Sequence, residues 1–135
     1  MGALAVAVWR GERAAKSRAR WSAAAVQAAK QSRRAWFPEI TEQADSAAVA
    51  RRLATAAAAI VLDPEAEISV ADIMLPEAGE IVLVVGPEGG ITPQEAQAFL
   101  TAGAAPARLG PTVLRSSSAG VVAAGILLSR TTRWA

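Results

Sequence analysis

Apolar and polar residues alternate along this chain in blocks that predict strands and helices in turn. Short apolar runs, several of them rich in β-branched residues, predict strands at residues 3–9, 60–62, 80–85 and 107–109. Alanine-rich stretches with long polar side chains predict helices at residues 14–34, 46–58 and 93–102. A final helix is expected from the N-cap candidates Ser116–Ser118 to about residue 130.

This order of elements indicates an α/β fold, a mostly parallel sheet flanked by helices. We expect Pro38 to end the first helix and Gly103 to close the helix over residues 93–102. Residues 69–75 predict a helical turn or a short helix. The 135 residues, 53% of them hydrophobic, are enough for one core and short for two domains.

The amino-acid composition excludes several kinds of catalytic and metal-binding site. The chain has no cysteine and no histidine, which excludes disulfides, thiolate catalysis, cysteine zinc sites and the commonest general base. We therefore expect no metal site, and a cytoplasmic location fits the absence of cysteine. The apolar start at residues 3–9 has no preceding basic residue and is not expected to be a secretion signal. Residues 119–128 are too few to span a membrane and are expected to form a buried helix.

Positive charge gathers at the start of the chain. Residues 1–36 carry eight lysines and arginines against Glu12 alone, a local net charge of +7. One interpretation is a solvated helix face. The alternative is a surface that meets phosphate groups, where binding would weaken with salt.

The most informative motif is the loop Gly86-Pro87-Glu88-Gly89-Gly90, which follows the apolar run 81–85 and precedes the helix start Thr92-Pro93-x-Glu95. Open α/β sheets bind ligands at such strand ends. The loop lacks the Gly-Lys-Ser/Thr ending of a P-loop and the glycine spacing of a dinucleotide site, and a turn without a ligand is the simplest alternative. However, Asp63-Pro64-Glu65 and Leu109-Gly110-Pro111 also end predicted strands, so the three loops should share one edge.

Arg115 lies between the last of these loops and the final helix. A surface arginine is usually only solvated. Because the start of a helix already carries positive potential, a cation there needs a reason, and an anionic partner would be one. The neighbouring serines are most simply helix caps.

Several motifs together resemble the RsmE family of 16S ribosomal RNA uridine-N3 methyltransferases in the SPOUT superfamily. They are Glu12-Arg13 with Lys16, Arg20-Trp21, Ala28-Ala29-x-Gln31-Ser32-x-Arg34, Pro38-Glu39, Val85 through Glu95, and Leu109-Gly110-Pro-x-x-Leu114-Arg115-x-x-x-Ala119. The resemblance covers almost the whole chain. It implies a carboxyl-terminal trefoil knot, the SPOUT α/β knot, a feature that most folds avoid.

The sequence departs from that family in two ways. Residues 1–135 resemble the methyltransferase domain without the amino-terminal PUA-like RNA-binding domain and without the first strand and helix of the methyltransferase domain. In addition, many members carry glutamate where this chain has Ser117, so the role of that carboxylate does not transfer.

The resemblance also implies roles for individual residues. Arg115 is the catalytic candidate, and Arg13, Lys16, Arg33 and Arg34 are expected to contact RNA. The residues expected to bind S-adenosylmethionine are Leu62, Val85, Gly86, Pro87, Glu88, Gly89, Gly90, Leu109, Gly110, Leu114, Ser116, Ser117 and Ala119. Expected partners are 16S ribosomal RNA or the small ribosomal subunit, and a second copy of the chain, contacted through residues 21–32 and the last helix. Two alternatives stay open: a cofactor- or RNA-binding fragment without turnover, and a nucleotide-dependent hydrolase.

Overall fold

The computed structural model describes residues 12–134. In chain order the elements are α1 (Glu12–Gln31), α2 (Ser46–Thr55), β1 (Ala58–Leu62), β2 (Ile81–Val84), α3 (Pro93–Thr101), β3 (Ala105–Ala107) and α4 (Ser116–Ser129). The strand predicted at residues 3–9 lies outside the described part of the chain.

The three strands form one parallel sheet in the order β2-β1-β3. Ile60 of β1 is paired with Leu83 on one side and with Ala105 on the other. The prediction of a parallel sheet flanked by helices is thus confirmed. Because the strands run parallel, their carboxyl ends lie at the same edge of the sheet.

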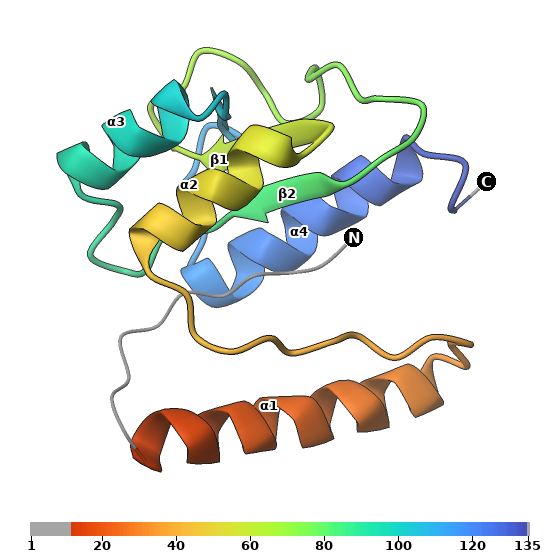
Figure 1. Ribbon diagram of the computed structural model, residues 1–135. Coiled ribbons are helices and arrows are strands. Elements are labelled where there is room, and N and C mark those ends of the chain that lie inside the picture. The colour runs from red at the N-terminus through yellow and green to blue at the C-terminus, as the bar shows by residue number, and fades with distance from the viewer. Residues whose placement is uncertain (1–11, 135) are drawn as a thin grey trace.

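Helices lie on both sides of the sheet, with α2 and α3 on one side and α4 on the other (Figure 1), and successive residues of β1 pack toward opposite sides. Ala59 and Val61 pack in a cluster with Leu53 of α2 and Phe99 of α3. Ile60 packs in a second cluster that includes Leu127 of α4. Helices therefore cover both faces of the sheet, which explains why the central strand is apolar at every position.

Side-chain caps fix the starts of two helices. Asp45 caps α2 by accepting the backbone N–H of Ala48 at 2.7 Å. Thr92 and Glu95 form a capping box at α3, in which the Thr92 hydroxyl accepts from the Glu95 N–H and the Glu95 carboxylate accepts from the Thr92 N–H. Gly103, with φ of 95°, closes α3 as predicted.

Several predicted boundaries are wrong, among them the start of α1, which lies at Glu12 and not at residue 14, and the start of β1, which lies at Ala58 and not at residue 60. The first helix ends at Gln31, before the predicted residue 34 and well before Pro38, because the chain already turns at Ser32–Arg34. The second ends at Thr55, because the Glu80 carbonyl accepts the N–H groups of Ala57 and Ala58 and so draws them toward the sheet. The last strand lies at 105–107 and not at 107–109. Its central residue is Pro106, which an edge strand tolerates.

Within the region 69–75, residues 70–72 form a turn, one of the two forms predicted, and Ser69 makes an isolated bridge to Arg108. The prediction that residues 119–128 form a buried helix is only half right. Ala119, Ala123 and Leu127 are buried, whereas Val121 on the opposite face is 74% exposed. Within residues 12–134, no helix combines the length and the apolar character that crossing a membrane requires.

Candidate functional site

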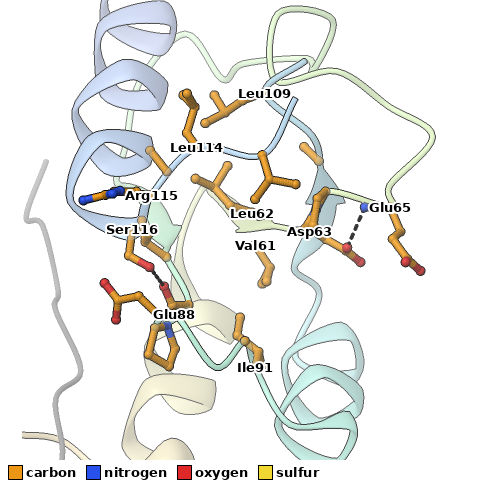
Figure 2. Close-up of a pocket in the computed structure, with 18 of the residues that line it drawn as sticks. Val61, Leu62, Asp63, Glu65, Glu88, Ile91, Leu109, Leu114, Arg115 and Ser116 are labelled. Carbon is orange, nitrogen blue, oxygen red and sulfur yellow. Dashed lines mark hydrogen bonds between the residues drawn. The ribbon is translucent and has the colours of Figure 1, made fainter. Parts of the chain in front are cut away.

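A pocket of about 550 Å³ opens at the carboxyl ends of the three strands. It lies between the segments that follow β1, β2 and β3 and the first turns of α4 (Figure 2). Its volume is within the range of small-molecule sites. Two loops far apart in the sequence, one containing Gly86 and Gly90 and the other containing Leu114, thus line one cavity, as predicted.

The glycine loop has a shape that only small residues allow. Gly90 has φ of 80° and donates its N–H to the Pro87 carbonyl at 2.8 Å, which closes a turn. A Cβ on Gly86 would stand 2.9 Å from Cγ1 of Ile91, too close for an ordinary contact. Glycine at position 86 therefore lets the loop fold back onto Ile91, which itself lines the pocket.

Ser116 ties the two loops together. Its hydroxyl donates to the Gly86 carbonyl at 2.6 Å, as drawn in Figure 2, across 30 positions of sequence. The prediction that one of the three serines caps α4 is wrong, because Arg115 occupies the N-cap position without a side-chain cap bond. The Ser116 hydroxyl is used for the contact with Gly86 instead.

A second hydrogen bond holds the other end of the glycine loop. The Ser46 hydroxyl of α2 donates to Glu95 at 2.7 Å, next to the capping box of α3. The hydroxyl of Ser46, together with the hydroxyl and backbone N–H of Thr92, holds the pKa of the Glu95 carboxyl below its ordinary value. The loop is therefore held both at Gly86 and at Thr92.

Charged side chains occupy the two ends of the pocket. In Figure 2, Arg115 and Glu88 lie at one end and Asp63 and Glu65 at the other, with the apolar side chain of Leu62 between them. Asp63 accepts the backbone N–H of Glu65 at 2.9 Å, which orders the loop after β1. The lining therefore carries three carboxylates and one guanidinium around an apolar middle.

Most of the predicted cofactor residues are brought together in this pocket. Those that line it are Leu62, Val85, Gly86, Pro87, Glu88, Gly90, Leu109, Gly110, Leu114, Ser116 and Ala119, with the catalytic candidate Arg115. Gly89 and Ser117 are not among the lining residues, and both are exposed.

The predicted set missed part of the lining. Asp63, Pro64 and Glu65 could have been included, because they end a strand at the same edge. Val61, Ile91, Ala96, Ala107, Thr112 and Val113 also line the pocket, and their positions depend on how helices and loops pack around it.

The predicted RNA contacts lie elsewhere, on α1 and just after it. Arg13, Lys16, Arg33 and Arg34 are all exposed, and none of them lines the pocket. Arg18, on a different side of α1, instead donates to the Ile40 carbonyl at 3.0 Å and pairs with Glu42 at 3.7 Å. That side faces the segment that returns along α1, visible in Figure 1.

Comparison with known proteins gives consistent matches. Residues 2–128 match the family model of the RNA methyltransferase domain. The chain is 45% identical over 133 residues to ribosomal RNA small subunit methyltransferase E of Mycobacterium bovis, covering 96% of this chain and 51% of the relative. The chain thus spans about half the length of the curated relatives it matches.

Solved structures agree with this match. A Legionella pneumophila protein in complex with the bound cofactor SAM superposes with a TM-score of 0.82 at 26% identity, over 93% of this chain and 51% of that one. Ribosomal RNA small subunit methyltransferase E from Neisseria gonorrhoeae, bound to S-adenosyl methionine, superposes with a TM-score of 0.73 at 30% identity, over 92% of this chain and 51% of that one. Together with the family match, these likenesses confirm the resemblance seen in the sequence, and the chain belongs to the RNA methyltransferase domain family.

Proposed function

We propose that this chain carries out S-adenosylmethionine-dependent methylation of N3 of a uridine in 16S ribosomal RNA. The observation that carries the proposal is the single pocket formed by the glycine loop and the segment 109–116. Both solved relatives described above hold the same cofactor. A cytoplasmic location, where ribosomes are assembled, fits this function.

The pocket residues suit that cofactor. Apolar walls such as Leu62 and Leu109 fit the adenine ring, and the backbone of the glycine loop can hydrogen-bond polar edges without side chains in the way. The carboxylates of Asp63 and Glu65 favour a ligand that carries positive charge. We assign the cofactor contacts to the predicted residues that line the pocket. Gly89, in the glycine loop, and Ser117, in the first turn of α4, would act only through the shape of the backbone there.

The cofactor, when bound, supplies an electrophilic methyl group. The protein has to position the uracil and favour transfer of its N3 proton to water. Arg115, at the pocket rim, is our candidate for this step, because a guanidinium beside the uracil stabilises negative charge on the deprotonated ring. The target nucleotide must leave its stack to reach the pocket.

The basic surface of α1 is our candidate for the RNA backbone. Arg13 and Lys16 are three positions apart and so share one side of the helix, and Arg33 and Arg34 follow its end. Each neutralised phosphate would release counterions and make binding salt-dependent.

We also propose that two copies pair through residues 21–32 and α4, and that the carboxyl-terminal part is threaded as a trefoil knot. Exposed apolar residues on α4, Val121 and Val122, support pairing, because a monomer gains nothing from leaving them in water. Sedimentation showing a strict monomer at high concentration would contradict the pairing. The absence of an amino-terminal RNA-binding domain from residues 1–135 stays a prediction.

Two measurements test the function. Calorimetry with S-adenosylmethionine should show binding to the parent chain, and no binding would refute the cofactor assignment. Methyl transfer from labelled cofactor to unmodified small ribosomal subunits then distinguishes an enzyme from a binding fragment without turnover. We expect Arg115→Ala to lower the rate of label incorporation by about a hundredfold while leaving the cofactor affinity nearly unchanged.

A further inference from the structure

An exposed aromatic pair follows α1. Trp36 is 81% exposed and Phe37 is 56% exposed. Two adjacent large aromatic side chains in water are unusual for a monomer, and an amphipathic aromatic surface is typical of a binding site. Neither residue lines the pocket, so the methyl-transfer site does not explain their exposure.

The backbone just before this pair is strained. Arg33 has φ of 53°, the sole positive φ of a non-glycine residue within residues 12–134. It closes α1 by donating to the Lys30 carbonyl, while Arg34 donates to the Ala29 carbonyl. This is the Schellman pattern, whose left-handed position strongly prefers glycine.

The end of α3 gives an internal comparison. There Gly103 has φ of 95° and donates to the Leu100 carbonyl, and Ala104 donates to the Phe99 carbonyl. The two helices thus end in the same way, yet α1 places arginine where α3 places glycine. Such strain is retained where the side chain has a use besides folding.

Basic residues precede the aromatic pair in the chain, and one acidic residue, Glu39, follows it two positions after Phe37. Arg33 and Arg34 are exposed, and neither forms an ion pair with another described residue. Lys30 stands in the last turn of α1. This surface therefore combines cations suited to phosphates with flat rings suited to bases.

We propose that Trp36 and Phe37 stack on unpaired bases of an RNA strand whose phosphates contact Arg33 and Arg34. The proposal rests on the proposed function in that the substrate is RNA. Stacking on aromatic side chains requires single-stranded nucleotides and is largely independent of their sequence. A second copy of the chain fits this surface less well, because pairing two such surfaces about a two-fold axis would bring like charges together.

The contact lies outside the pocket, so it should affect RNA affinity and KM for RNA but not kcat. We expect Trp36→Ala to weaken binding of a labelled single-stranded oligoribonucleotide about tenfold, with the salt dependence unchanged. Trp134→Ala is the matched control, since Trp134 is 57% exposed at the other end of the described chain. Equal RNA affinity of the two variants would overturn the proposal.

Arg33→Gly separates a binding role from a structural one. Glycine relieves the left-handed strain, so the melting temperature should stay the same or rise. RNA affinity should nevertheless fall, and the slope of log K against log salt should decrease by about 0.7, as expected for one lost phosphate contact to a single strand. Unchanged affinity and slope would refute a phosphate contact by Arg33.

Calorimetry with S-adenosylmethionine on the same variants distinguishes failure of the RNA-stacking site from failure of the assigned cofactor pocket. A parent chain that binds the cofactor but not RNA overturns the stacking site alone. A parent chain that binds RNA through Trp36 but not the cofactor supports the stacking site and refutes the assigned pocket. If Trp36→Ala changes the sedimentation coefficient and leaves RNA affinity intact, the surface is a contact between copies and the proposal fails.

Discussion

Replacement of Ser116 by alanine tests whether the tie between the two loops organises the pocket. The hydroxyl donates to the Gly86 carbonyl at 2.6 Å, and Ser116 is half-buried. A neutral hydrogen bond of this kind contributes about 1 kcal/mol net, because the freed carbonyl regains water. We therefore expect Ser116→Ala to lower the free energy of unfolding by about 1 kcal/mol and the melting temperature by roughly 2–6 °C.

Cofactor binding should also weaken. If the glycine loop must be reordered when the ligand binds, the same energy appears in the affinity, and about 1 kcal/mol corresponds to roughly a fivefold increase in Kd. Calorimetry with S-adenosylmethionine measures this change, and thermal unfolding measures the stability.

Two variants control the interpretation. Ser116→Thr keeps the hydroxyl and should retain near-parental affinity. Ser117→Ala removes a hydroxyl from the same turn but at an exposed position outside the pocket lining, so it should change neither quantity. If Ser116→Ala binds the cofactor as tightly as the parent, or if Ser117→Ala is equally impaired, the tie between the loops has no part in forming the site.

Three further predictions concern the backbone and the acid stability. Gly79→Ala should destabilise the fold by about 2 kcal/mol or more, because Gly79 has a backbone φ of 106° and the new Cβ would lie 2.6 Å from the Cβ of Ala57. A denaturant midpoint equal to that of the parent would contradict this prediction. Gly89→Ala, with no atom within 4 Å of its Cβ, should change stability by less than about 0.5 kcal/mol. The pKa of the Glu95 carboxyl is lowered in the folded protein, so its ionised form stabilises the fold at pH values above the ordinary carboxyl pKa of 4.5. This stabilisation is lost as the pH falls through the pKa of the folded state. The Glu95→Gln variant should therefore unfold at a lower temperature than the parent at pH 7 and lose less stability on acidification. If the melting temperatures of variant and parent change with pH to the same extent, the reasoning is wrong.

The local pattern of the sequence was enough for the order and type of most elements. β-branched runs, the Thr92-Pro93 helix start and Gly103 act over a few residues, so their effects can be seen without the fold. The shared edge of three loops also followed from the sequence, because parallel strands all end on the same side of a sheet. This is why most predicted cofactor residues line one pocket.

Other features were decided by contacts between residues distant in the chain. The hydrogen bond from Ser116 to Gly86 spans 30 positions of the chain. It makes Ser116 a connection between two loops, although the surrounding sequence predicts a helix cap. Pro106 entered the sheet because pairing with β1 offset its poor strand propensity. The left-handed turn at Arg33 runs against local preference altogether. Local propensities differ by only about 1 kcal/mol, so packing and long-range hydrogen bonds determine the outcome wherever the two disagree.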